Sequence, residues 1–324
     1  MRGPASRADA TGGKRETMAR RKKGKAIHGW LVLDKPAGAT STQALGTVKR
    51  IYEAQKAGHA GTLDPLATGI LPIALGEATK TVSFAVDGEK AYRFTVRWGS
   101  ETDTDDAEGA VTATSERRPA RADIEALLGR FTGEISQVPP RYSAIKVEGA
   151  RAYDLARDGE EVVLAPRLVV IDALRIVEHE ADGTSTVLEA ECGKGTYVRA
   201  IARDMGRALG CHGHVSQLRR TRVGPFSEAD SVTIAALEAT AEAEGEAGLA
   251  RLLLPVEAAL EDVPALAVSS SDAANLAQGR AVLIRGRDAP ILSGPMYATC
   301  KGRVVALGEV ERGALHPTRV FNLG

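Results

Sequence analysis

The chain has 324 residues, 44% of them hydrophobic, and its 42 Lys and Arg residues balance its 42 Asp and Glu residues. This length favours about two domains, and the absence of any apolar run near the roughly 18 residues of a membrane span excludes a membrane protein. Three cysteines form no disulfide framework, and residues 1–25 lack the apolar centre of a secretory signal. We therefore expect a cytoplasmic protein in a reducing compartment.

The neutral total charge hides two basic segments. Residues 1–25 carry nine Lys and Arg side chains against two acids, and residues 194–222 carry seven against Asp204 alone. Such blocks on a neutral chain favour one face that binds a polyanion. The alternative is that the tail and the second block are merely solvated.

The amino-terminal third predicts a tail followed by short strands and helices. Residues 1–26 are poor in hydrophobic side chains, so we expect them to be disordered. A short apolar strand from His28 leads into a Pro/Gly turn. Apolar residues three apart predict a helix over 41–53, capped by Ser41 or Thr42. The pattern then predicts a buried strand over 70–76, a helix over 77–86 and an alternating strand over 90–99.

The middle of the chain predicts a strand over 185–192 and a helix that ends at Gly210. In that helix Ile201, Met205 and Leu209 recur at fourfold spacing. Strands and helices do not alternate regularly along the chain. We therefore expect an α+β fold with a mainly antiparallel mixed sheet flanked by helices.

A change of composition over 236–262 predicts a domain boundary. We expect a basic tail over 1–27, a large α+β domain over 28–258 and a small β-rich domain over 262–324. The small domain is predicted to hold a helix over 271–278, capped by Ser270 or Ser271, and short strands around AVLI, MYATC, RVVALGEV and RVFN.

One acid stands alone in the stretch GHAGTLDPLATGILPIALGEATK at 58–80. An isolated carboxylate in apolar surroundings is costly to desolvate without a partner. Because Pro65 follows Asp64, this acid fits a helix N-cap with proline at the first helical position. The glycines around it, however, leave the backbone open to a ligand, which favours a functional site.

The same stretch closely resembles the catalytic-aspartate motif of the TruB family, the bacterial tRNA pseudouridine-55 synthases. The similarity is strong over about residues 28–228 and looser beyond, where it implies a PUA-like RNA-binding domain. Five further motifs match in family order: LDKPAGATS at 33–41, KAYRFTVRWGSETDTDDAEG at 90–109, PPRYSAIKVEGARAYDLARDG at 139–159, CGKGTYVRAIARDMGRALG at 192–210 and HVSQLRRTRVGPF at 214–226.

The resemblance implies that the protein isomerises uridine to pseudouridine at position 55 in the T loop of tRNA. This reaction breaks the N1–C1′ bond of a uridine, turns the base and rejoins it through C5, so it needs no cofactor. One carboxylate suffices as nucleophile, which fits the isolation of Asp64, whereas glycosidases generally need two. Attack at the sugar and a glycal route both remain open.

The resemblance assigns the catalytic roles to Asp64, Tyr92 and Arg199. Arg199 would keep the carboxylate ionised in a closed pocket, and Tyr92 would stack on the base and serve in proton abstraction. A solvated helix arginine and a core tyrosine are the alternatives. His59 would lie beside the flipped-out uridine, unless it is a loop histidine bonded to backbone. Substrate or RNA contacts are expected at His59, Lys80, Leu218, Lys35, Lys194, Arg219 and Arg220.

We expect no metal and no cofactor. The stretch DTDDAEG at 103–109 lacks the ligands of a calcium loop, and the spacing of Cys192, Cys211, His212 and His214 fits no zinc pattern. The expected partner is the T stem-loop of tRNA, bound by a monomer without guide RNA, protein partner or membrane. The rivals are an RNA-binding or RNA-folding protein without turnover and a guide-RNA-dependent rRNA pseudouridine synthase.

Overall fold

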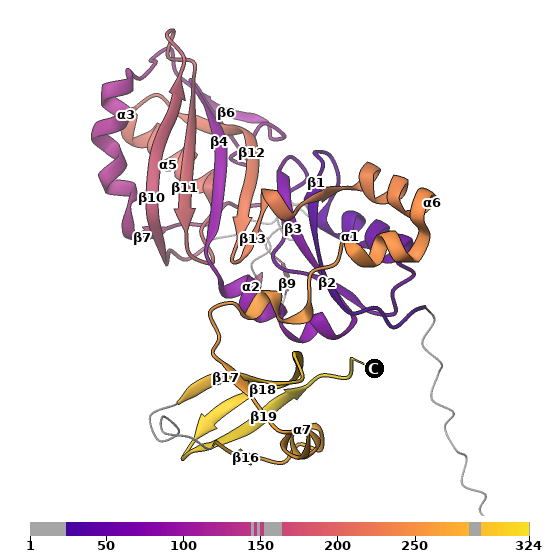
Figure 1. The fold of residues 1–324 in the computed structure, drawn as a ribbon. Helices are drawn as coiled ribbons and strands as arrows, with labels where there is room; N and C mark the ends of the chain where they lie inside the picture. The colour runs from indigo at the N-terminus through magenta and orange to yellow at the C-terminus, as the bar shows by residue number, and fades with distance from the viewer. Residues whose placement is uncertain (1–23, 144–145, 148–149, 152–163, 285–292, 324) are drawn as a thin grey trace, which may run out of the picture.

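The computed structural model describes residues 24–143, 146–147, 150–151, 164–284 and 293–323. Most of the expected tail and part of the motif at 139–159 lie outside these residues. Within them, a sheet of ten strands is flanked by helices, and a second sheet of five strands follows it along the chain (Figure 1). This confirms the α+β class with a small β-rich carboxy-terminal unit.

The main sheet is mixed but mainly antiparallel, as expected. Among the described strands of this sheet only the β14/β1 and β3/β12 pairs are parallel. Its spatial order is β14 (Val232–Thr233), β1 (Gly29–Lys35), β3 (Thr68–Leu75), β12 (Gly213–Val223), β4 (Lys90–Trp98), β11 (Ser185–Cys192), β10 (Arg167–His179) and β7 (Gly133–Gln137), with β2 (Ala57–His59) on β3 and β13 (Phe226–Ser227) on β12.

The parallel join of β3 and β12 brings the two halves of the sheet together. Gly69 pairs with Arg220 there, and a Cβ at Gly69 would lie 2.2 Å from the Arg220 carbonyl oxygen. Only glycine therefore permits this approach, and its φ of +96° is one that other residues rarely adopt. Asp64 lies in the segment just before β3. The join places this segment beside β12 and β4.

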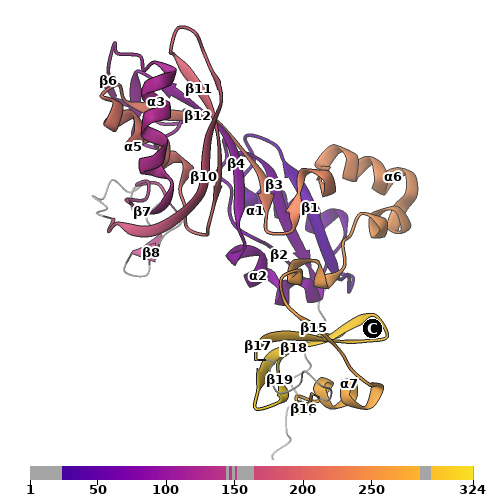
Figure 2. The same cartoon turned by 60° about the vertical axis from the view of Figure 1, so that its left-hand side comes forward.

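Helices cover one face of the sheet with a continuous apolar core. The helices α5 (Val198–Leu209) and α3 (Arg121–Leu128) lie on the same side of β10 and β11 (Figures 1 and 2). Ile201 and Met205 of α5 are fully buried there, which confirms the fourfold pattern. At the other end, α1 (Ser41–Ile51) and α6 (Ile234–Arg251) cover β1 and β3.

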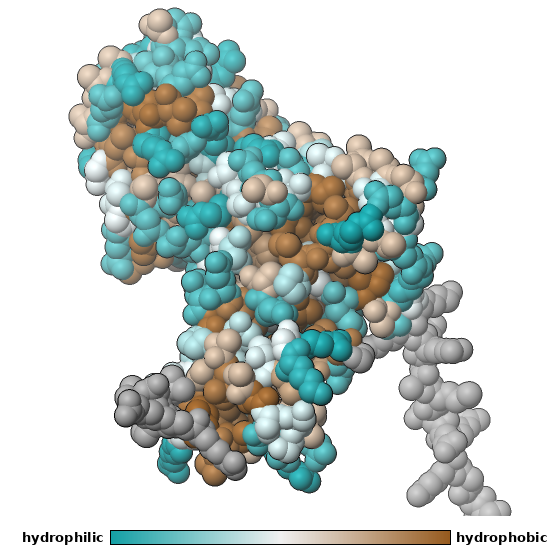
Figure 3. Space-filling view, in the orientation of Figure 1, coloured by the Kyte–Doolittle hydropathy of each residue, from teal (hydrophilic) through white to brown (hydrophobic). Residues whose placement is uncertain are grey.

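The face of β4, β10 and β11 that points away from α5 combines ion pairs with exposed apolar side chains of β10, namely Leu168, Val170 and Val177. Arg93 and Arg175 each donate to Glu189 across neighbouring strands. Figure 3 shows hydrophilic side chains around a hydrophobic patch on this lobe, and further hydrophobic side chains around β1, β2 and β3. The positive charges of this face are thus largely offset within the sheet.

Two predicted elements differ in detail. Thr40, not Ser41 or Thr42, caps α1 by accepting a hydrogen bond from the Gln43 amide. The helix expected over 77–86 is divided into η1 (Gly76–Lys80) and α2 (Val82–Asp87). The Thr81 hydroxyl donates to the Ala78 carbonyl at 2.9 Å, a local bond that competes with a continuous helix.

The carboxy-terminal sheet shares apolar contacts with the main domain. Val304 and Phe321 join a cluster with Trp30 and with Leu260 of η4 (Val256–Leu260). Ser269, one residue before the predicted cap, accepts from the Asp272 amide and caps α7 (Ser270–Ala277). The strand order is β15 (Ala265–Ala267), β17 (Gly294–Cys300), β18 (Arg303–Glu311), β19 (Ala314–Val320) and β16 (Val282–Leu283).

Small elements complete the described fold. No helix in it is both long and apolar enough to cross a bilayer. The remaining short elements are the hairpins β5 (Ser100–Thr102)/β6 (Val111–Thr114) and β8 (Lys146–Val147)/β9 (Ala150–Arg151), and the turns η2 (Gly129–Phe131) and η3 (Glu228–Asp230).

Candidate active site

A cavity of about 280 Å³ opens where the loop before β3 meets β4, β12 and the start of α5. It is lined by six of the ten side chains that the sequence singled out, namely Asp64, Tyr92, Lys194, Arg199, Leu218 and Arg220. Four different segments of the chain contribute them. The cavity is therefore the candidate active site.

Asp64 lies in an irregular loop, and no helix begins after Pro65. The N-cap interpretation is therefore wrong. The residue before Asp64 is fixed from both sides, because the Ser41 hydroxyl donates to the Leu63 carbonyl at 2.9 Å and accepts from the Leu63 amide at 2.8 Å. The serine expected as a helix cap instead holds the loop that carries the carboxylate.

The Asp64 side chain is 38% exposed and lines the cavity, and its carboxylate meets the Arg199 guanidinium at 3.0 Å. Desolvation raises the pKa of Asp64, while the positive charges of Arg199 and Lys35 oppose that rise and Asp106 adds to it. A carboxylate in this position is poorly solvated and depends on Arg199 for its charge. Such a perturbed acid in a cavity is typical of a functional group.

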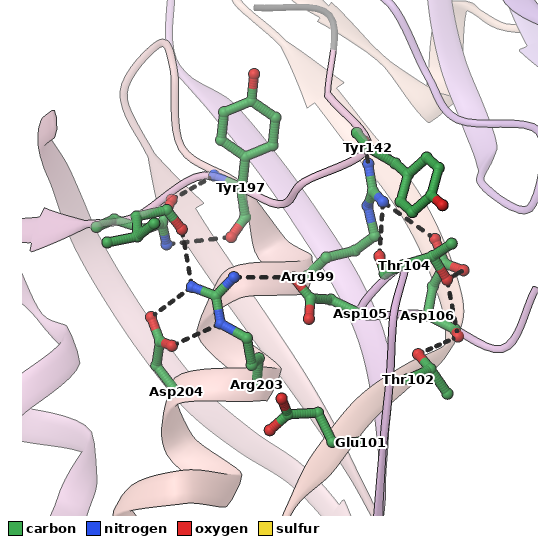
Figure 4. Close-up of polar contacts among 12 residues, drawn as sticks. Glu101, Thr102, Thr104, Asp105, Asp106, Tyr142, Tyr197, Arg199, Arg203 and Asp204 are labelled. Atoms are coloured by element: carbon green, nitrogen blue, oxygen red, sulfur yellow. Dashed lines mark hydrogen bonds and ion pairs between the residues drawn. The ribbon is translucent and has the colours of Figure 1, made fainter. Parts of the chain in front are cut away.

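Arg199 projects from the first turn of α5 and makes four contacts although its side chain is only 6% exposed; Figure 4 shows those with Tyr142, Thr104 and Asp106. Each of its two terminal nitrogens contacts one carboxylate and one backbone carbonyl. Nη2 reaches Asp64 and donates to the Tyr142 carbonyl at 2.9 Å. Nη1 lies 3.3 Å from Asp106 and donates to the Thr104 carbonyl at 2.8 Å. The guanidinium thus bridges two carboxylates in a fixed plane.

Asp106 is a site residue that sequence reasoning missed. Its buried carboxylate accepts from the Thr104 hydroxyl at 2.6 Å and the Glu108 amide at 3.0 Å. Two acids of the rejected calcium loop, Asp105 and Asp106, therefore pair with arginines, and the described residues hold no cluster suited to a metal ion. The sequence did contain a sign of this pairing. Acids cluster over 101–106, and three arginines recur at fourfold spacing in another segment, namely Arg199, Arg203 and Arg207.

Arg220 is buried and binds the backbone of the loop that contains Asp64. It donates to the carbonyls of Ile70 at 2.8 Å, Gly61 at 3.1 Å and Thr62 at 3.4 Å. It pairs across the strands with Tyr92 and hydrogen-bonds that side chain. Burial raises the pKa of Tyr92, and the Arg220 charge acts against this rise. The arginine therefore joins the Asp64 loop to the tyrosine.

Lys35 is fully buried rather than presented to a ligand. Its ammonium donates to the carbonyls of Pro36 at 2.8 Å, Ala39 at 2.7 Å and Pro65 at 3.3 Å. Desolvation lowers the pKa of Lys35, with the Asp64 charge opposing. It is thus a clamp on the residue after Asp64, and it adds positive charge to the pocket.

Like Lys35, three further predicted contact residues do not line the cavity. His59 lies half-buried in β2, and its Nδ1 has no hydrogen-bond partner among the described residues. Lys80 donates to Glu77 and, at 2.7 Å, to the Val320 carbonyl of the carboxy-terminal unit. Arg219 contacts both carboxylate oxygens of Asp34, at 3.0 Å and 2.9 Å.

The charged side chains of the basic segment 194–222 pair largely with acids within the described structure. Most of these acids come from other segments of the chain, Arg203 also pairs with the neighbouring Asp204, and Arg220 binds carbonyls instead. The partners are Asp87 for Lys194, Asp64 and Asp106 for Arg199, Asp105 and Asp204 for Arg203, Glu101 for Arg207, Asp34 and Glu228 for Arg219, and Glu89 and Glu191 for Arg222.

Replacing Arg220 by lysine is expected to loosen the Asp64 loop. A lysine keeps the charge but cannot span three carbonyls and the tyrosine with one ammonium group, and each buried acceptor left unpaired costs about 1–3 kcal/mol. We expect a lower melting temperature and at least a roughly tenfold slower reaction, since small displacements of a reacting group are costly.

Arg222→Lys is the matched control for Arg220→Lys, because Arg222 lies two residues along β12 in a partly exposed ion-pair cluster. Exposed pairs contribute about 0–1 kcal/mol, so this variant should differ little from wild type. If both variants behaved alike in melting and turnover, the role of Arg220 in holding the Asp64 loop would be refuted.

Comparison with known proteins agrees with this geometry. The family model for the N-terminal domain of TruB family pseudouridylate synthases matches residues 49–198, and that for the tRNA pseudouridylate synthase B C-terminal domain matches residues 199–261. The tRNA pseudouridine synthase B of Rhodopseudomonas palustris is 64% identical over 92% of this chain and 81% of its own.

Two further relatives extend the comparison. The tRNA pseudouridine synthase B of Caulobacter vibrioides is 56% identical over 94% of this chain and 100% of its own length. Among solved structures, a chain in a Cbf5-Nop10-Gar1 complex is similar with a TM-score of 0.69 and 26% identity, covering 91% of this chain and 84% of that one.

Proposed function

Because the chain belongs to the TruB family of pseudouridylate synthases, we propose that it isomerises a uridine of tRNA to pseudouridine. The observation that carries this proposal is Asp64, held against Arg199 in a small cavity that Tyr92 also lines. A protein that only bound RNA would not require a carboxylate whose pKa is raised by burial beside a buried guanidinium.

The reaction moves one bond of the base and changes no oxidation state. The N1–C1′ bond breaks, the uracil turns within the site, C5 bonds to C1′, the C5 proton leaves to a base, and N1 takes up a proton. A cavity of about 280 Å³ suits a single extruded nucleoside rather than a stacked helix. The uridine therefore leaves its loop before the bond breaks.

The site residues divide into three catalytic groups and their supports. Asp64 acts as the nucleophile or, on a glycal route, as the group that accepts a sugar proton. Arg199 keeps it ionised and oriented, and Tyr92 stacks on the base and takes the C5 proton. The positive charge of Arg220 favours the phenolate that this proton transfer needs. Leu218 supplies an apolar wall.

The substrate is uridine 55 in the T loop of tRNA, bound without a guide RNA or partner protein. The high identity to proteins named tRNA pseudouridine synthase B supports tRNA over the guide-dependent alternative. We further propose a cytoplasmic monomer with a catalytic domain over 28–258 and a PUA-like domain over 262–324. Lys194 at the cavity mouth, with His59, Lys80, Arg219 and the basic tail, would meet the RNA.

The deciding experiment is incubation of the pure protein with unmodified tRNA, followed by mapping of pseudouridine. We expect one product, at position 55. Binding without product would favour the RNA-binding alternative. Product only after addition of a guide RNA would favour the guide-dependent one.

An isolated T-arm hairpin should also react. The cavity accepts one extruded base, so recognition of the loop shape around it should suffice. Changing stem sequence with pairing retained should leave the rate within about threefold, whereas variants that disrupt the loop fold should lose most of it. The measurement is the initial rate on each hairpin beside full-length tRNA. Reaction of the full-length tRNA alone would contradict the local account.

A further inference from the structure

A second buried ion pair lies one helical turn beyond Arg199. Arg203 follows it by four residues, so the two side chains leave the same face of α5 (Figure 4). Arg203 donates to Asp105 at 2.9 Å and to the Val138 carbonyl at 2.8 Å. It also binds both oxygens of Asp204, at 2.8 Å and 3.1 Å.

Asp105 lies in sequence between Thr104 and Asp106, the two residues that contact Nη1 of Arg199. The Thr104 carbonyl accepts from Arg199, and the Asp106 carboxylate pairs with it. Asp105 itself has a φ of +62°, a left-handed conformation that costs free energy in residues other than glycine. Its side-chain bond to Arg203 and its carbonyl, which accepts from the Val215 amide at 3.1 Å, hold this turn.

We propose that Arg203 and Asp105 are positioning residues, which hold the turn at 104–106 so that Arg199 keeps the plane in which it meets Asp64. The inference rests on the proposed function and adds to it a pair that touches neither substrate nor Asp64. One turn of α5 thereby aligns the catalytic aspartate, while the next turn aligns the residues that orient Arg199.

Because the Arg203–Asp105 pair is buried, each side chain needs the other to compensate its charge. Each side chain is only 7% exposed. Burial raises the pKa of Asp105 to about 6, against the opposing charges of Arg203 and Arg199, and Glu101 adds to the rise. Without Arg203, the carboxylate would be a buried charge that lacks its closest partner, and the turn would relax to solvate or protonate it.

The test compares Arg203→Gln, the double variant Arg203→Gln with Asp105→Asn, and Arg207→Gln. The double variant replaces the ion pair by two amides that can still hydrogen-bond. Arg207 lies one turn further along α5 and is the matched control, because it pairs with Glu101 and its side chain is 54% exposed. Melting temperature, tRNA affinity and single-turnover rate against pH are measured for each full-length protein.

We expect Arg203→Gln to lower the single-turnover rate at saturating tRNA by about tenfold or more, with affinity little changed. The acid limb of its pH profile should move to higher pH, because a displaced Arg199 stabilises ionised Asp64 less. The double variant should recover much of the rate, and Arg207→Gln should stay within about twofold of wild type.

Two results would overturn the inference. One is an Arg203→Gln rate that matches the Arg207→Gln rate. The other is a slower rate with an unshifted acid limb, which would reduce Arg203 to general support of the fold. Absence of product with the wild-type protein would instead refute the proposed function, so the two failures are distinguishable.

Discussion

Asp64→Asn is expected to abolish pseudouridine formation while tRNA still binds. The substitution removes the negative charge and the nucleophilic oxygen but leaves a side chain of nearly the same size in the cavity. Loss of a nucleophile that acts together with its neighbours lowers turnover on the order of 10⁴-fold or more. The rate is measured under single-turnover conditions with saturating tRNA, and affinity is measured separately.

The same variant should not be less stable than wild type near neutral pH. Because burial raises the pKa of Asp64, the folded protein binds this proton more tightly than the unfolded chain does. The contribution of the carboxyl group to stability therefore falls as pH rises through the raised pKa. Neutral asparagine avoids that loss, and Arg199 keeps Asp106 and two carbonyls.

Melting curves at several pH values check this expectation, with Glu53→Gln, an exposed carboxylate in an ion pair with Lys25, as the control. The Asp64→Asn protein should melt at or above the wild-type temperature at pH 7. Turnover near the wild-type rate would remove Asp64 from the chemistry. A large loss of stability would show that its charge supports the fold.

Local patterns predicted much of the fold because they record which face of an element is buried. Strand β11 has the predicted bounds, and every second side chain in it is buried. Helix α5 ends at Gly210, which adopts a φ of +67°. The helix caps were shifted by one residue, since neighbouring Ser and Thr residues look alike in sequence and only the backbone conformation selects among them.

The partners of the charged residues were not predictable in this way. Arg199 and Asp64 are far apart in sequence, and so are Arg203 and Asp105. Periodicity along one segment contains no information about the segment that packs against it. The partners of the basic stretch and the burial of Lys35 and Arg220 could therefore not be predicted. Their burial follows from the tertiary fold alone.

The pairing of Asp64 with Arg199 was predictable only through family resemblance. Asp-Pro after a glycine-rich stretch also fits a helix cap, and the local sequence could not decide between the two. The structure excludes the helix cap. The Ser41 hydroxyl binds both the amide and the carbonyl of Leu63, which keeps the loop irregular. That serine lies in a different motif, at the start of α1.

Arg199→Lys should slow the reaction by at least tenfold, about 1.4 kcal/mol of barrier. The arginine bridges Asp64 and Asp106 and also binds two carbonyls. A lysine ammonium supplies one charged centre and cannot serve both carboxylates in one plane. Binding of tRNA should change little, because the guanidinium is almost completely enclosed by protein.

Arg199→Met should be slower still and should reveal the charge pairing through pH. Without the guanidinium, two carboxylates face each other across the site, and burial together with Asp106 pushes the pKa of Asp64 further upward. Activity that needs ionised Asp64 is lost as pH falls through this pKa, so the acid limb should move to higher pH. The measurement is single-turnover rate against pH for wild type, Arg199→Lys and Arg199→Met, with Arg222→Met as the control from an outer ion pair. A lysine variant as fast as wild type would contradict the bridging geometry, and a methionine variant with an unmoved acid limb would contradict the pairing of Arg199 with Asp64.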